Sequence, residues 1–366
     1  MGLTTFNNVK AAEVQILLDQ LWAEPSTSKS YGVKAHALKA VLENQTAVLT
    51  ELENPDQKRD VSVKWVDFCG DTSADGQYAD NCTPAAGDEG TAKKQDYALD
   101  VFITDSYSVA QEELESAVVS YDQIVATGLA AKIKNIIERF NAKVVAAIAA
   151  NKGTNPFPGA YSYDNVTKDT TVVGADYGVK KLYPYFMQVS EMNRSQSVYL
   201  LDGGNLFQDY YIAKKTVAND NGKAEASMYD DIPFRHDMAG FAANALSANS
   251  FLIDKGSLAV ANRAKFPSLQ KLAGMKDGGW IHTSNGNIMR YSIPVNIPDL
   301  MPMMFISQNA LKKQQLLIDV QHSVVCTEGG LLLPTWQLKL RAGVFANPIR
   351  CNAGNTGILS FVKAAE

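Results

Sequence analysis

The segment from residue 70 to residue 96 most constrains how this chain folds, because it offers almost nothing to a hydrophobic core. It contains no Val, Ile, Leu, Met, Phe or Trp, and it carries six acidic side chains against two lysines. Apolar residues alternate with polar ones around Val63 and Trp65, and again from Tyr97 to Ile103, which predicts a β-strand on each side. Because an isolated hairpin is only marginally stable, we expect this segment to lie on another surface.

The stretch 69–82, "CGDTSADGQYADNC", allows several interpretations. Asp71 and Asp75 match the first and fifth positions of a helix-loop-helix calcium loop, but the twelfth position holds Cys82 instead of a bidentate glutamate. The chain start lacks the pattern of a secretion signal, and four cysteines in 366 residues then favour free thiols over a Cys69–Cys82 disulfide. We therefore expect a solvated loop without a metal ion.

The overall composition is that of a globular protein with 46% hydrophobic and 20% charged residues, long enough for about two to three compact units. Apolar runs such as 144–150 are too short to cross a bilayer, which needs about 20 residues. The net charge of −5 gives no basic footprint for sequence-specific binding of nucleic acid. It does not exclude a shell that encloses nucleic acid without binding it specifically.

Three helical patterns cover the first 155 residues. Apolar stripes run from Val9 to Trp22 and from Val33 to Leu52, and each needs a distant partner, either in the body of its own chain or in another copy. A third pattern, from Asp122 to Asn151, predicts a spine helix of about 45 Å. It stops where Gly153 suits a left-handed cap and Pro156 forbids continuation.

A mixed α/β region follows the spine. We expect a helix over 176–193, a strand at "SVYLL", a short helix in "GGNLFQDYYIA", a strand at "SFLID", a helix-like segment in "KGSLAVANRA", a hairpin in "WIHTSNGNIMRY" with Asn285-Gly286 at its turn, a second hairpin around Asn221-Gly222, and alternating strands at 316–324 and 336–342.

One cluster has the residue types of an enzyme. "DIPFRHD" brings together Asp231, Arg235, His236 and Asp237, which suits acid/base chemistry in a hydrolase but also suits a solvated strand edge or an interface. We find no two-histidine zinc pattern, no phosphate-binding glycine loop and no dinucleotide-binding turn. The sequence therefore predicts no enzyme, no catalytic residue, no cofactor and no metal.

The order of these segments resembles that of the major capsid proteins of tailed bacteriophages, which have the Hong Kong 97 fold. An N-terminal extension, a long strand-flanked loop, a spine helix, a central α/β region and closing strands follow one another. Three stretches also look like that family: "YDQIVATGLAAKIKNIIERFNAKVVAAIAANKG", "SFLIDKGSLAVANRAKF" and "LPTWQLKLRAGVFANP". The resemblance covers most of the chain.

The resemblance implies an α+β, Hong Kong 97-like fold with five parts. They are a helical N-terminal arm (1–60), an extended hairpin loop that lies on a neighbouring subunit (61–104), a peripheral domain with the spine helix (105–155), an axial domain (156–324) and return strands to the peripheral domain (325–366).

It further implies a capsid protein that assembles with itself into hexamers and pentamers of an icosahedral shell around double-stranded DNA. The expected partners are other copies, a portal and other head proteins, and DNA without sequence specificity, but no membrane. The expected location is the virion, with assembly in the cytoplasm of the host bacterium. Two alternatives stay open, an encapsulin-like protein compartment of the same fold and a hydrolase that uses Asp231 and His236. The residues expected at contacts between subunits are Trp65, Asp71, Asp75, Tyr78, Asp80, Lys93, Lys94, Leu38 and Val41.

Overall fold

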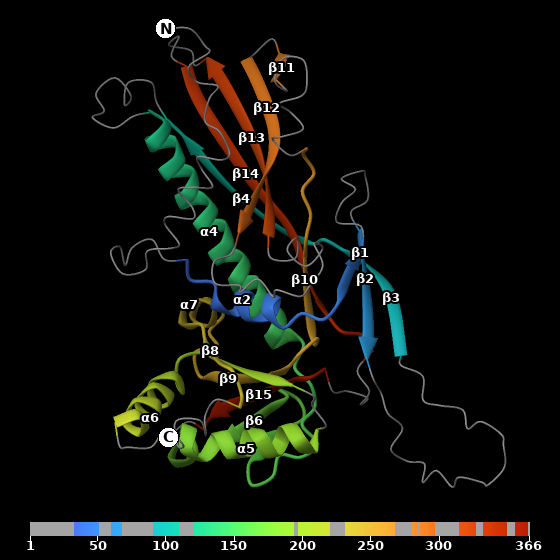
Figure 1. Ribbon diagram of the computed structural model, residues 1–366, viewed down its shortest axis with the longest axis vertical. Helices are drawn as coiled ribbons and strands as arrows, with labels where there is room; N and C mark the ends of the chain where they lie inside the picture. The colour runs from blue at the N-terminus through green and yellow to red at the C-terminus, as the bar shows by residue number, and fades with distance from the viewer. Residues whose placement is uncertain are drawn as a thin grey trace, which may run out of the picture.

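The computed structural model shows a mixed α+β chain with an elongated body (Figure 1). A long antiparallel sheet and helix α4 form one end, and a second sheet with helices α5 and α6 forms the other. A ribbon of strands β2 (Asp60–Asp67) and β3 (Thr91–Ala98) lies at one side of the body. The structure describes residues 33–50, 60–67, 91–109, 121–193, 197–219, 231–267, 280–283, 286–296, 315–326, 332–349 and 356–364.

Helix α4 (Tyr121–Ala150) is the predicted spine, and its bounds agree with the sequence pattern to within a residue. Its apolar stripe is buried along the whole length, from Val125 to Ile148. The end of the helix differs from the prediction. The Asn151 side chain donates to Ala147 O at 2.7 Å, while Gly153 donates its N–H to Ile358 O in a neighbouring strand.

The long sheet packs one face on α4. Its strand order is β10-β14-β13-β12-β11, and β4 pairs with the free side of β14. Alternate residues such as Ile103, Leu338 and Ile318 point at α4 and are almost fully buried, whereas the residues between them form the opposite face. The strands are β4 (Val101–Ser108), β10 (Leu258–Asn262), β11 (Trp280–Thr283), β12 (Gly286–Asn296), β13 (Gln315–Cys326) and β14 (Leu332–Ala346).

The second sheet, ordered β5-β6-β15-β9-β7-β8, is covered on both faces. Leu200 and Phe361 pack under α5, whereas Leu201 and Ile253 join the core that surrounds α4. One continuous core therefore links the two ends of the body. The elements are β5 (Ser162–Asp164), β6 (Asp169–Val172), α5 (Val179–Met192), β7 (Val198–Asp202), α6 (Phe207–Asn219), β8 (Phe234–His236), α7 (Met238–Ala243), β9 (Asn249–Asp254) and β15 (Ile358–Lys363).

Two of the predictions that were wrong took a strand for part of a helix. The stripe from Val33 to Leu52 is no single helix: α2 (His36–Glu43) ends where the Asn44 side chain caps Ala40 O, and β1 (Val48–Thr50) then pairs with β2. "KGSLAVANRA" is not helical but contains β10, because Leu258–Asn262 within it pair with β14. Small Ala259 and Ala261 fit beneath Trp65 and Phe345 there, so tertiary packing overrides their helix propensity.

The single strand expected from Tyr97 to Ile103 is also wrong, because β3 ends at Ala98 and pairs with β2, whereas β4 begins at Val101 and pairs with β14. The remaining predicted elements in the described part agree with the structure. The hairpin of β11 and β12 is confirmed, but Thr283 pairs with Gly286, which makes Gly286 the first strand residue instead of a turn residue. The helix expected over 9–22 and the hairpin around 221–222 lie outside the described residues.

Strand pairing groups the chain differently from the boundaries expected from the sequence. β12 and β13, expected in an axial part, belong to the sheet on the spine helix. β15, expected with the return strands, belongs to the sheet under α5. The division into arm, loop, peripheral and axial parts stays a prediction.

Candidate functional site

The ribbon of β2 (Asp60–Asp67) and β3 (Thr91–Ala98) is an antiparallel pair that leaves the body at the side. Its inner face packs on the body along most of β2, where Val61, Val63 and Trp65 are almost fully buried. Tyr97 stacks on Phe345 of β14 with ring centroids 4.3 Å apart and meets Trp65 edge-on. These aromatic contacts fix the direction of the ribbon relative to the body.

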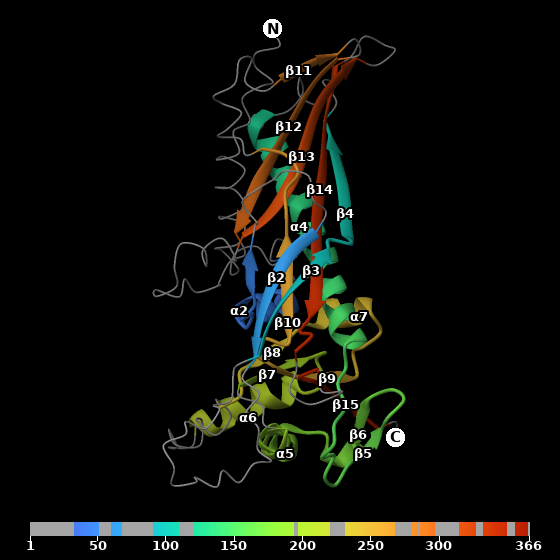
Figure 2. The same ribbon diagram turned by 90° about the vertical axis from the view of Figure 1, so that its right-hand side faces the viewer.

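The outer face of the ribbon is polar and exposed. Lys64 lies directly opposite Lys94. Val66, two residues further along β2 on the same face, is 58% exposed. Like charges at opposed positions of a β-ladder are unfavourable, and nearby carboxylates relieve them. Figures 1 and 2 both show the ribbon running toward the end of the body that carries α5 and α6, and away from the long sheet.

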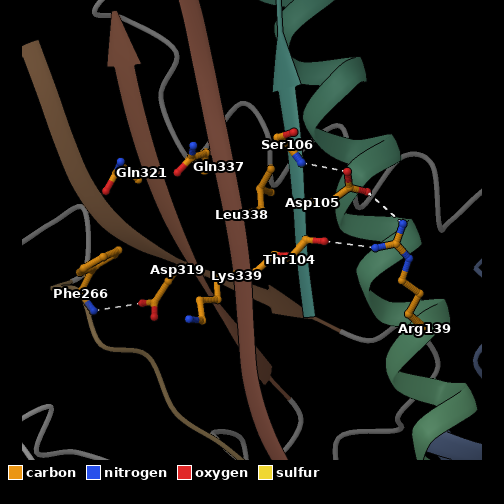
Figure 3. Close-up of a pocket in the computed structure, with 10 residues that line it drawn as sticks. All are labelled: Thr104, Asp105, Ser106, Arg139, Phe266, Asp319, Gln321, Gln337, Leu338 and Lys339. Carbon is orange, nitrogen blue, oxygen red and sulfur yellow. Dashed lines mark hydrogen bonds and ion pairs between the residues drawn. The ribbon is translucent and has the colours of Figure 1, made fainter. Parts of the chain in front are cut away.

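A second feature is a hollow lined by side chains of β4, β13 and β14 and bordered by Arg139 of α4 (Figure 3). Its volume is about 590 Å³. We call this surface the basic face. It is the side of the long sheet turned away from α4, and it is defined by Arg290, Lys339 and Arg341, together with Phe102 and Gln337.

Aromatic rings and strand edges hold these cations in place. Lys339 Nζ and the Arg341 guanidinium lie 5.1 Å and 5.7 Å from the centroid of the Phe102 ring. Arg290 lies 5.8 Å from the ring of Phe266, and its Nε donates to Gln321 Oε1 at 2.9 Å. A side chain restrained in this way loses less conformational entropy when it binds an anion.

The two carboxylates beside the hollow already have partners. Asp105 pairs with Lys132 at 3.2 Å, and the pKa of its carboxyl is lowered by the Ser106 N–H and by Lys132 and Arg139, which outweigh the opposing effect of burial. Asp319 accepts from the N–H groups of Lys265 and Phe266, and burial raises its pKa. The cations of the basic face are thus only partly neutralised.

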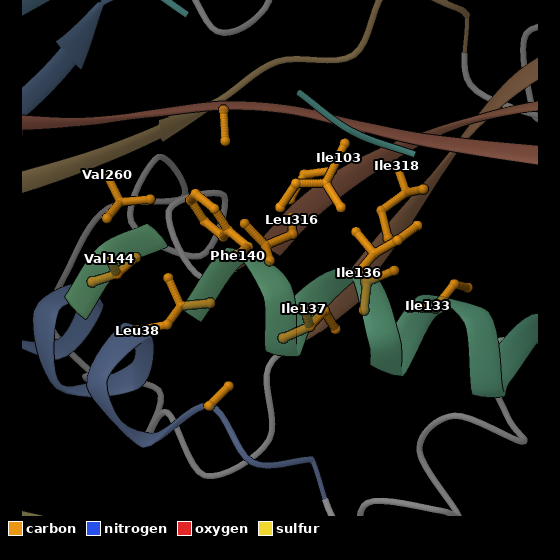
Figure 4. Packing of buried hydrophobic residues seen from close by; sticks show 14 of the residues in the cluster. Leu38, Ile103, Ile133, Ile136, Ile137, Phe140, Val144, Val260, Leu316 and Ile318 are labelled. Carbon is orange, nitrogen blue, oxygen red and sulfur yellow. The ribbon is translucent and has the colours of Figure 1, made fainter. Parts of the chain in front are cut away.

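Helix α2 docks on the body through backbone N–H groups. It has no side-chain cap of its own at Ala35. Instead, the N–H groups of Ala37 and Leu38 donate to Asp237 Oδ2 at 2.7 Å and to Asn141 Oδ1 at 2.8 Å. Its apolar side then packs on α4, with Leu38 beside Phe140 and Val144 (Figure 4).

Solved phage structures match the chain over most of its length. The capsid of Ralstonia phage GP4 shares 12% identity over 87% of this chain and 86% of that chain, with a TM-score of 0.43. The Cyanophage Pam1 capsid shares 9% identity over 85% of this chain and 86% of that chain, with a TM-score of 0.40. A structure from Mycobacterium phage Bobi shares 12% identity over 98% of this chain and 100% of that chain, with a TM-score of 0.42. No family model and no curated protein matches.

The residues expected at subunit contacts have different surroundings. Leu38, Val41 and Trp65 are buried in the core of their own chain, which leaves their side chains almost no surface for a neighbouring copy. Lys93 and Lys94 are exposed on β3, so contact with another copy stays a prediction for them. Asp71, Asp75, Tyr78 and Asp80 lie outside the described residues, as do Cys69 and Cys82.

The possible acid/base cluster is engaged in structural contacts. Asp237 is fully buried, and its two oxygens accept from Ala37 N, Asn141 Nδ2 and Gly240 N. Arg235 pairs with Glu43 of α2 at 3.1 Å. His236 stacks between Phe207 and His36, where burial and the neighbouring histidine lower its pKa. These contacts hold α2 on the body, and Asp231 is exposed beside them.

Within the described part of the chain, no three His, Cys, Asp or Glu side chains gather as they would around a metal ion. No helix in that part is long and apolar enough to span a membrane.

The sequence interpretation missed the basic face, although a signal for it was present. In "WQLKLRAG" the residues Gln337, Lys339 and Arg341 alternate with buried Trp336 and Leu338. A period of two places both cations on the face opposite the core. The facing positions on β4 and β13 depend on strand register, which the sequence does not show.

Proposed function

We propose that this chain is the major capsid protein of a tailed bacteriophage, and that its copies assemble into the hexamers and pentamers of an icosahedral shell around double-stranded DNA. The observation that carries the proposal is the β2–β3 ribbon. It is a stiff arm anchored by Trp65 and Tyr97, and it leads into a segment, 68–90, with too little apolar surface to fold alone. In a closed assembly every copy offers such an arm a neighbour.

The charge distribution supports a shell that holds DNA without binding it tightly. Segment 68–90 contains five acidic residues and no Lys or Arg. Taking these five from the chain's 39 acidic residues leaves 34, equal to its 34 Lys and Arg. A nearly neutral body has little of the phosphate-neutralising charge of a DNA-binding protein. On this proposal the protein is structural, located in the virion, and its partners are other copies, the portal and other head proteins.

The first test is the size of the purified full-length protein. We expect light scattering and electron microscopy to show hexamers, pentamers or closed shells that form as the concentration rises. A monomer at every concentration would contradict the proposal. In particles from a phage lysate, nuclease-protected double-stranded DNA separates a phage head from an encapsulin-like compartment, whose contents are protein.

The second test removes the end of the arm. Because β3 begins at Thr91, residues 68–90 are exchanged for Asn-Gly, which closes a two-residue hairpin between the paired Asp67 and Thr91. We expect native circular dichroism and a cooperative melt, but few or unstable shells. As a control, residues 165–168, between the paired Asp164 and Asp169, are exchanged in the same way. Normal shells without 68–90, or loss of shells in the control alone, would count against the arm.

A further inference from the structure

Three aromatic rings join helix α2 to the second sheet in one continuous stack. The ring of Phe207, the first residue of α6, lies 3.6 Å from the ring of His236 at the end of β8. His236 in turn lies 5.4 Å from His36, the first residue of α2, with an angle of 21° between the two ring planes. Both distances join ring centroids. Two of the three rings are therefore groups that can change charge between about pH 5 and pH 8.

The surroundings of the stack disfavour positive charge. His236 is partly buried, and burial and the neighbouring His36 lower its pKa. A positive charge on His36 would lie at the end of α2 that carries the partial positive charge of the helix. Neutral rings can stack without an electrostatic cost, whereas two imidazolium ions in the same positions repel each other. The contact between α2 and β8 is thus strongest when neither ring is charged.

The acidic groups around the stack are already engaged. Asp237 raises the pKa of His236, but less than burial and His36 lower it, and its two oxygens accept three hydrogen bonds. The carboxylates on the other packed elements accept hydrogen bonds or form ion pairs: Glu43 of α2 with Arg235 of β8, Glu138 of α4 with the Lys34 N–H, Asp202 of β7 with the Phe207 N–H, and Asp209 of α6 with the Val179 N–H. A charge on both histidines therefore gains little from them.

We propose that this stack makes the docking of α2 depend on pH, so that α2 is held firmly while both histidines are neutral and opens from the body when acid charges both. The inference goes beyond the proposed function, because it concerns the single subunit and needs no shell. Since the docked state lowers the pKa of His236, opening lets that ring bind a proton more readily, and a fall in pH shifts the balance toward the open state. Opening would uncover the side of α2 that packs on α4, including Leu38 and Ala40.

Thiol labelling measures the opening of α2 directly. Ala40→Cys places a thiol on the buried side of α2, and Ala130→Cys places one at an equally buried position of α4 as the matched control. Each full-length variant is treated with dithiodipyridine at about pH 7.5 and about pH 5, on either side of the ordinary histidine pKa. Mass spectrometry of the peptides separates the new thiol from the native cysteines. Each rate is divided by that of the same chain unfolded in urea, because the thiolate fraction also changes with pH.

Acid should raise the corrected labelling rate at position 40 at least about fivefold more than the rate at position 130, which is the lower end of ordinary coupling between two sites. His36→Gln with His236→Gln keeps polar side chains without a titratable ring and should remove this difference. His322→Gln, which changes a buried histidine of the long sheet, should leave it intact. These two sets of variants separate opening of α2 from a general loss of stability in acid.

Three results would overturn the inference: equal rises at positions 40 and 130, a difference that persists without the two stacked histidines, or a difference that disappears with His322→Gln alone. Circular dichroism shows whether the double variant folds. For a double variant that does not fold, His36→Gln alone decides, because His36 is exposed and its exchange leaves the core intact. The single variant must then reduce the difference, and an unchanged difference would equally refute a pH-dependent α2.

Discussion

Removal of the Asp237 carboxylate should release helix α2 from the body and destabilise the whole chain. The side chain is fully buried and accepts three hydrogen bonds, at 2.7 Å from Ala37 N, 2.7 Å from Asn141 Nδ2 and 2.8 Å from Gly240 N. Asp237→Ala leaves all three donors without their acceptor in a site closed to bulk water. The bonds join three elements: α2, α4 and α7.

The expected loss of unfolding free energy follows from these three donors. Each buried donor left without a partner costs about 1–3 kcal/mol, and loss of the N-cap of α7 is part of that sum. Allowing for partial relaxation, we expect Asp237→Ala to lower the free energy of unfolding by about 3–6 kcal/mol. Since domains are commonly stable by about 5–15 kcal/mol, this is a large fraction of the total.

Urea denaturation followed by tryptophan fluorescence measures the change. Asp231→Ala is the matched control, because Asp231 belongs to the same acidic stretch but is exposed, and we expect a change within about 0.5 kcal/mol. Asp237→Asn with Asn141→Asp should recover part of the loss, since the amide of residue 237 then donates to the carboxylate at 141. A urea midpoint for Asp237→Ala equal to that of Asp231→Ala would refute the role of Asp237 in holding α2 on the body.

Three further predictions concern the core around α4. A methyl group at Gly128 would collide with the Tyr107 ring, so Gly128→Ala should lower the free energy of unfolding by about 1–2 kcal/mol net despite better helix propensity. Tyr107→Ala in the same chain should cancel this extra loss, as urea denaturation would show. His322 is buried against Trp336, and burial lowers its pKa to about 4. Between about pH 6.5 and pH 4 the unfolded chain therefore binds a proton that the native chain does not. The free energy of unfolding should fall by about 3 kcal/mol as the pH drops through this window. In urea titrations at several pH values, His322→Gln should make the free energy of unfolding depend less on pH. Ile136→Pro, in the middle of the buried stripe of α4, should give insoluble protein at a cost of about 3 kcal/mol or more, and a soluble variant that forms shells would contradict the role of the spine.

Elements with a strong internal period could be predicted from the sequence, and elements defined by distant partners could not. The apolar stripe of α4, and the alternation of apolar and polar residues in β13 and β14, each show which side chains of that element are buried. By contrast, β10 has an alanine-rich sequence suited to a helix, and only its pairing with β14 and its place beneath Trp65 make it a strand. The end of α2 at Glu43 likewise depends on the pairing of β1 with β2.

The same distinction explains why the acidic cluster at 231–237 was ambiguous. Its residue types suit catalysis, and the sequence shows nothing of the helix that occupies it, because Ala37 lies 200 positions before Asp237. Once α2 is in place, Asp237 caps a helix from outside that helix and Arg235 pairs with Glu43. A buried carboxylate used in this way holds together parts that local sequence leaves separate.

The separation of the cores suggests why folding and assembly can be changed independently in this chain. The large core runs without interruption from the long sheet through α4 and α2 to the second sheet. The ribbon has its own small cluster around Trp65, which also contains Ala47 beside β1, Ala259 and Ala261 of β10 and Phe345 of β14. Changes beyond Asp67 and Thr91 are therefore remote from the large core, and their free-energy cost should appear in contacts between copies. A charge change on the basic face has the same property, because Lys339 and Arg290 point away from α4. Substitutions within 68–90 should thus alter shell formation while the melting temperature of the subunit stays constant.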